Sequence, residues 1–172
     1  MRNPRPSRKP SVSAGVQPSS RLSQDLRERY RQYFPRVFAY VYGRIRDSRA
    51  TEDLASEVFR RAFARVDALA DEGTFEIWLF TVARDVLTSH CRGQSPREHT
   101  PEDDLLQRPD LARLLEHLRH LQLREQDIIA LKFDAQLTNS QIAQVMQLSE
   151  GKVGVMLYRT LRKLRKALER DA

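Results

Sequence analysis

The sequence predicts an all-α protein in which two small helical domains are joined by a flexible linker. Three observations lead to this prediction. The 172 residues include only six glycines and are 31% charged, a composition that favours helices over sandwiches or barrels. Apolar residues recur at steps of three and four in several segments, as on one face of a helix. A stretch rich in proline and acidic residues separates these segments into two groups.

The N-terminal segment differs from the rest of the chain. Residues 1–22 contain four Pro, five Ser, five Arg or Lys, and no acidic residue. Such a segment cannot bury enough apolar surface to offset the entropy that ordering would cost. We therefore expect a disordered basic tail.

Residues 23–92 are expected to form the first domain. Ser23 and Thr51 are suitable N-caps for its first and second helices. Pro35 should kink or split the first helix, because proline removes a backbone hydrogen bond. Trp78 falls at helical spacing among apolar residues, which is more typical of a core position than of a base-stacking one. The expected helices are Ser23–Ile45, Thr51–Val66 and Phe75–Cys91.

Residues 93–110 are expected to be the linker, because they contain three Pro, five acidic residues and little apolar content. The second domain covers residues 111–172. In its last helix an apolar stripe should face inward, formed by Val153, Leu157, Leu161, Leu164 and Leu168. The expected helices are 111–121, 124–135, 139–146 and 150–169.

Residues 138–168 have the pattern of a helix-turn-helix, in which a short helix, a tight turn and a longer basic helix follow one another. Ser149 can cap the longer helix, whose N-terminus suits a phosphate. An exposed basic helix of this kind enters the major groove of DNA. A helical hairpin with a charged outer face is the alternative. The residues expected to point outward are Lys152, Met156, Arg159, Arg162 and Lys163.

The charge and the cysteine content narrow the class of protein. The net charge is +7, and the excess lies at both chain ends, which suggests nucleic-acid binding, with a solvated surface as the alternative. The single cysteine, Cys91, fits a reducing cytoplasm. No apolar run approaches the roughly 20 residues of a membrane helix, so no membrane insertion is expected. We find no catalytic constellation and no zinc-ligand spacing, and we expect neither enzyme activity nor a metal or other cofactor.

Two blocks of sequence resemble the bacterial RNA polymerase sigma factors of the extracytoplasmic-function (ECF) group. The resemblance covers roughly residues 23–170, apart from most of the linker. The second block is residues 123–168, which include the helix-turn-helix. The first block carries Glu52, Asp53, Leu54, Glu57, Val58, Phe59, Phe75, Trp78, Leu79, Ala83 and Arg84.

The resemblance implies that the first domain binds the clamp of core RNA polymerase and melts the −10 element of a promoter. The loop Ala68–Gly73 would receive a base flipped from the non-template strand. The implied polymerase-binding residues are Asp53, Leu54, Glu57 and Arg60. The implied −10 contacts are Asp71, Glu72, Arg84, His90 and Arg92.

The resemblance also implies that the second domain docks on the polymerase flap and binds the −35 element. An anti-sigma protein is a further expected partner. The expected function is therefore that of a cytoplasmic, non-enzymatic initiation factor that directs polymerase to a subset of promoters. The implied −35 contacts are Ser149, Lys152, Met156, Tyr158, Arg159 and Arg162.

Some positions depart from the pattern of the group. Gln147 stands where the turn usually has glycine, and Gly154, Val155 and Met156 stand where Lys, Ser and Arg are common. The loss of basic residues should weaken phosphate contact. Two alternatives therefore remain: a dimeric helix-turn-helix regulator of duplex DNA, and a polymerase-binding adaptor that has lost promoter reading.

Overall fold

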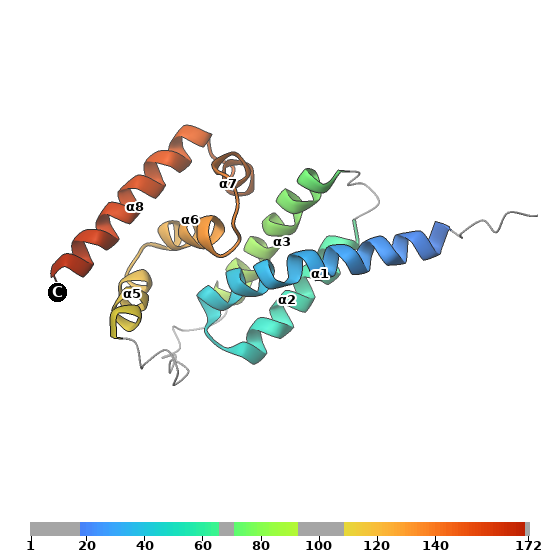
Figure 1. The fold of residues 1–172 in the computed structure, drawn as a ribbon, viewed down its shortest axis with the longest axis horizontal. Helices are drawn as coiled ribbons and strands as arrows, with labels where there is room; N and C mark the ends of the chain where they lie inside the picture. Colours follow the sequence, from blue (N-terminus) through green and yellow to red (C-terminus); the bar gives the residue numbers. More distant parts are fainter. Residues whose placement is uncertain (1–17, 66–70, 93–108, 171–172) are drawn as a thin grey trace, which may run out of the picture.

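The computed structural model describes residues 18–65, 71–92 and 109–170, in which every regular element is an α-helix (Figure 1). The all-α prediction is confirmed. No helix within these ranges combines the length and apolar character that a bilayer crossing requires. Outside the described residues lie the first 17 residues of the expected tail, Val66 at the end of the expected second helix, residues 68–70 of the expected base-binding loop and residues 93–108 of the expected linker. Glu72 and Gly73, which we assigned to that loop, belong to the third helix, which therefore begins before the predicted Phe75.

The first domain consists of the helices α1 (Pro18–Ile45), α2 (Ser48–Phe63) and α3 (Glu72–Arg92). The start of α1 corrects the sequence prediction. Residues 18–22, which we assigned to the tail, are helical, and Ser23 lies inside the helix instead of capping it. Proline is well suited to the first turn of a helix, because its missing N–H has no partner there in any case.

The predicted break at Pro35 is absent, because α1 runs through this residue as one helix. Pro35 lies on the exposed side. Aromatic contacts continue past it along the helix, with ring centroids 5.1 Å apart for Tyr30–Phe34 and 5.9 Å apart for Phe34–Phe38. Packing of this kind supplies most of the stability of a helix in a protein and here outweighs the lost hydrogen bond.

Aspartates cap both α2 and α3. The side chain of Asp47 accepts a hydrogen bond from the Ala50 N–H at 2.7 Å, whereas Thr51, the predicted cap, is fully buried inside α2. Asp71 accepts a hydrogen bond from the Thr74 N–H at 2.8 Å. Each aspartate satisfies an N–H that the helix itself leaves free.

The second domain consists of α5 (Pro109–Arg119), α6 (Leu123–Phe133), α7 (Asn139–Met146) and α8 (Glu150–Arg170). Residues 109–110, which we assigned to the linker, begin α5. The helix-turn-helix of α7 and α8 is present as predicted, and α7 begins with a capping box. In this box the Thr138 N–H donates to the Gln141 side chain at 2.9 Å and the Gln141 N–H donates to the Thr138 hydroxyl at 3.2 Å. Gln147 ends α7 in the left-handed conformation, with φ 55°, which explains why glycine is usual there.

The two domains share one continuous hydrophobic core. In the first domain, α2 packs against both α1 and α3. The second domain then packs α7 against α3 and α6 against α1 (Figure 1). Trp78 lies against this core, partly buried, which confirms its structural role. Core residues from both domains include Val37, Val58, Leu79, Ile128, Leu131 and Ile142.

Replacing Gly154 in α8 with alanine should stabilise the protein. A Cβ at this position meets no other atom within 4 Å, so the substitution causes no clash. Alanine in a helix interior is favoured over glycine by about 1 kcal/mol. We expect G154A to raise the free energy of unfolding by about that amount in urea denaturation. A decrease would contradict the helical geometry described for this part of α8.

Candidate nucleic-acid interface

The outer face of α8 carries most of the predicted −35 contacts. Ser149 lies at the start of the helix, where its hydroxyl accepts a hydrogen bond from the Lys152 N–H at 3.4 Å. The other exposed members of the predicted set are Lys152, Tyr158, Arg159 and Arg162. A basic and accessible helix face suits the phosphate backbone and base edges of DNA.

Met156 does not point outward as predicted, because it is partly buried and packs against the core. The residue that sequence analysis missed is Val155, which is 49% exposed. The signal was in the sequence, since Val155 lies midway between Val153 and Leu157, both on the buried stripe. The accessible face of α8 is therefore less basic and more apolar than we expected.

The inner face of α8 fixes the orientation of that outer face. Its buried residues are Val153, Leu157, Thr160 and Leu164. Leu161, which we placed on the stripe, is 43% exposed, because steps of four, three and four keep Thr160 inside instead. Lys163 adds an ion pair to Glu125 of α6 at 2.9 Å.

The predicted polymerase-binding residues lie together on α2. Asp53 and Arg60 are exposed, and Leu54 is partly buried against the core. Glu57 binds two guanidinium groups, those of Arg60 at 2.6 Å and Arg61 at 2.5 Å. Hydrogen bonds from Arg60 and then Arg61 lower the pKa of Glu57 to about 2. This surface of α2 is therefore charged and locally ordered.

The predicted −10 contacts are spread along the whole of α3. Asp71 and Glu72 lie at its start, and His90 and Arg92 near its end, so about 27 Å of helix separates the two groups. Asp71 is occupied as a cap, and its bond from Thr74 lowers its pKa. Glu72 accepts hydrogen bonds from Gln32 and, at 3.4 Å, from the Tyr33 hydroxyl. The structure thus gives both acidic residues structural partners.

Arg84, the central predicted −10 contact, faces the second domain. Its Nε lies 3.3 Å from Oδ2 of Asp127 in α6. Arg44 of α1 binds Oδ1 of the same carboxylate. The side chain of Asp127 is only 12% exposed. Two arginines of the first domain therefore enclose one carboxylate of the second.

A second polar contact joins the domains nearby. Arg36 of α1 donates to the carbonyl of Ala135, with Nε at 2.8 Å, and forms an ion pair with Glu76 of α3. Glu76 in turn accepts a hydrogen bond from Gln141 of α7 at 2.5 Å. The polar groups at this contact are thus paired across the domain boundary.

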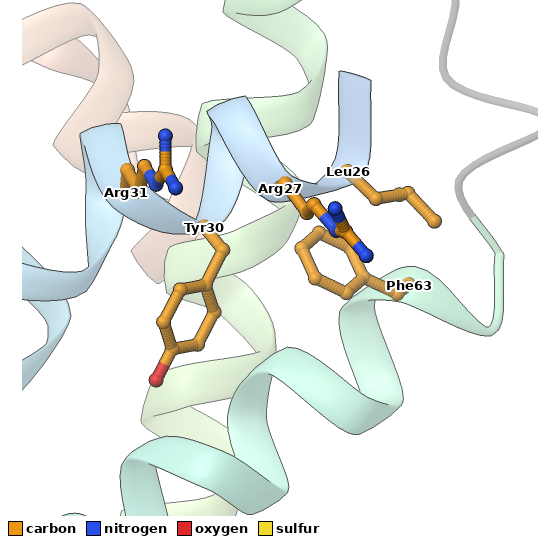
Figure 2. Close-up of a pocket in the computed structure, with 5 residues that line it drawn as sticks. All are labelled: Leu26, Arg27, Tyr30, Arg31 and Phe63. Atoms are coloured by element: carbon orange, nitrogen blue, oxygen red, sulfur yellow. The ribbon is translucent and has the colours of Figure 1, made fainter. Parts of the chain in front are cut away.

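An apolar hollow lies between residues 26–31 of α1 and the end of α2 (Figure 2). Tyr30 and Phe63 supply its aromatic surface, and Arg27 and Arg31 lie beside them. The Tyr30 ring is 38% exposed and contacts Phe59 with centroids 4.7 Å apart. Aromatic and cationic side chains together are the surface that stacks on unpaired bases.

The chain matches two family descriptions, in the order that sequence analysis predicted. Residues 29–97 match Sigma-70 region 2, and residues 111–164 match Sigma-70, region 4. The first match covers α1, α2 and α3, and the second covers the helix-turn-helix. Fold and site therefore define a protein that contains both sigma-70 regions.

Two proteins of similar sequence are RNA polymerase sigma factors. The ECF RNA polymerase sigma factor BldN of Streptomyces coelicolor is 32% identical over 83% of this chain. This chain spans 60% of BldN's own length. RNA polymerase sigma factor YlaC of Bacillus subtilis is 24% identical over 85% of this chain and 93% of its own. The chain belongs to the ECF group of the sigma-70 family.

Solved structures support the fold. The sigma factor RpoE of Bartonella quintana, crystallised with the anti-sigma factor NepR, superposes with a TM-score of 0.67 at 17% identity, over 87% of this chain and 99% of its own. CnrH, solved with the cytosolic domain of CnrY, gives a TM-score of 0.64 at 18% identity, over 90% and 91% of the two chains.

The arginine pair around Glu57 can be tested by titration. We expect the double variant R60Q/R61Q to raise the pKa of Glu57 from about 2 toward its ordinary value of 4.5, because both hydrogen bonds are lost. The pairs stabilise the folded protein above the unfolded pKa, and this contribution disappears as the pH falls toward 2. An NMR pH titration measures the shift. A pKa that stays near 2 would contradict the described contacts.

Proposed function

We propose that this protein binds core RNA polymerase, directs it to a subset of promoters and helps to open the DNA. The observation that carries the proposal is the presence of both sigma-70 regions in one chain, in the order of region 2 and then region 4. In this proposal the protein acts in the cytoplasm and by binding, not by catalysis.

The proposal assigns a role to each surface. The charged face of α2, with Asp53, Glu57 and Arg60, binds the polymerase clamp. α3, with Arg84 and His90, binds the −10 strand. The outer face of α8 binds the −35 duplex, supported by its exposed basic residues and its accessible N-terminus.

An anti-sigma protein is a proposed partner. Support comes from two solved structures of the same fold. RpoE was crystallised with the anti-sigma factor NepR, and CnrH was solved in complex with the cytosolic domain of CnrY. We propose no identity for the partner of this chain.

The test of the function is run-off transcription on genomic promoter fragments, with core RNA polymerase and with or without this protein. New discrete transcripts are the expected result. If polymerase binds the protein and no transcript appears, the adaptor alternative is favoured. If polymerase does not bind it, the duplex-DNA regulator becomes the better explanation.

Two charge-reversal variants distinguish loss of the proposed polymerase contact from a general effect of changing the protein's charge. We expect E57K to reduce capture by core polymerase at least tenfold, because it inverts the charge of the α2 face. E169K is the matched control, since Glu169 is likewise paired with an arginine, Arg165 at 2.8 Å, but lies exposed at the far end of α8. Equal capture of E57K and wild type in a pull-down would rule out this face.

The apolar outer face of α8 predicts a thymine in the −35 element. Val155 and Tyr158 are 49% and 66% exposed on this face, and apolar side chains in the major groove contact the thymine methyl group. We expect uracil in place of one −35 thymine to weaken binding of the wild type and to leave V155A unaffected. Fluorescence anisotropy with promoters found by run-off measures both. Equal sensitivity of the two proteins would contradict the contact.

A further inference from the structure

We propose that Asp127 is the latch of an autoinhibitory contact between the two domains. Its carboxylate occupies an anion site formed by Arg44 and Arg84, and in the open protein this site binds a DNA phosphate. We call Arg44, Arg84 and Asp127 the latch. The inference rests on the proposed function of α3, and it adds Arg44 as a DNA-binding residue and Asp127 as its competitor.

The chemistry of the latch matches that of a phosphate contact. Arg44 and Arg84 come from different helices, α1 and α3, yet they bind the two oxygens of one carboxylate. Guanidinium groups bind carboxylate and phosphate oxygens through the same geometry. The Arg44 side chain is 11% exposed and that of Arg84 is 29% exposed, so Asp127 leaves little room for a second anion.

The packed arrangement excludes simultaneous binding of two promoter elements. The −10 and −35 elements are centred about 25 base pairs apart, which is roughly 85 Å of B-DNA at about 3.4 Å per step. In the structure α7 packs directly against α3, and α6 against α1. A protein that binds both elements must therefore separate these helices and with them the latch. Residues 93–108 can span up to roughly 50 Å as an extended chain, so the covalent connection permits separation.

The closed arrangement of the two domains also buries one group that destabilises it, the hydroxyl of Tyr40. The Tyr40 hydroxyl is fully buried and has no hydrogen-bond partner among the described residues. Burial is the main cause that raises the pKa of Tyr40, and the nearby Asp127 carboxylate raises it further. A buried hydroxyl without a partner destabilises the state that buries it. Opening would expose this group to water. The latch therefore holds together an interface in which one buried hydroxyl lacks a hydrogen bond. This cost lowers the stability of the closed state and makes opening easier.

The contact includes one position where packing alone can be changed. A Cβ on Gly43 would lie 2.8 Å from Oδ2 of Asp134, the residue that follows α6, so even alanine would require the Asp134 carboxylate to turn aside. Asp134 is half-buried, and burial raises its pKa while Arg46 lowers it. We expect leucine at Gly43, which extends well beyond a Cβ, to loosen the contact between α1 and the end of α6 and to leave every charge of the latch in place.

The test uses the full chain without polymerase or promoter, so its outcome is separate from that of run-off transcription. We expect D127N to increase the radius of gyration in small-angle X-ray scattering and to bind a fluorescent 20-nucleotide oligothymidine about tenfold more tightly than wild type. E169Q is the matched control, because it removes the same charge from an exposed pair outside the contact. The added substitution R44Q or R84Q in D127N should remove the gain in affinity.

The latch is ruled out if folded D127N keeps the wild-type radius of gyration, or if its affinity gain does not exceed that of E169Q. An affinity gain that survives R44Q and R84Q would overturn the anion site. Circular dichroism checks folding. If D127N does not fold, G43L decides: expansion and tighter oligothymidine binding support the latch, and unchanged values refute it. If D127N behaves as expected and run-off transcription yields nothing, only the proposed function fails.

Discussion

A carboxylate that is largely removed from water needs positive partners, and at Asp127 both partners come from the other domain. This requirement fixes where α6 lies on α1 and α3. The position of α6 in turn fixes α8, through the apolar inner face of α8 and the ion pair between Lys163 and Glu125. The direction in which the outer face of α8 points thus depends on an ion cluster far from it in sequence.

Much of the fold could be predicted, because its signals are local. The bounds of α7 and the start of α8 follow from periodicity and from capping residues such as Thr138. Local rules failed where packing outweighed them. Pro35 does not split α1, because aromatic contacts continue across it, and Thr160 takes the buried place that we gave to Leu161. These errors concern single positions within helices whose existence was predicted correctly.

The candidate site was predictable on α8 and much less so on α3. Helical spacing alone separates Lys152 and Arg159 from the buried stripe, and a stricter use of it would have exchanged Met156 for Val155. Nothing local connects Arg84 with Asp127, since a charged residue on a helix usually indicates a solvated face. The pairing follows only from the packing of α6 and α7 on the first domain, which depends on contacts distant in sequence.

The covalent connection between α3 and α5 has a consequence for regulation. Because the two halves of the contact belong to one molecule, closure behaves as a first-order equilibrium and does not weaken on dilution. Every ligand that binds only the open form loses affinity by the same factor, the fraction of open molecules. Promoter DNA that binds both domains would therefore meet this threshold, and a single substitution at the domain contact would shift it.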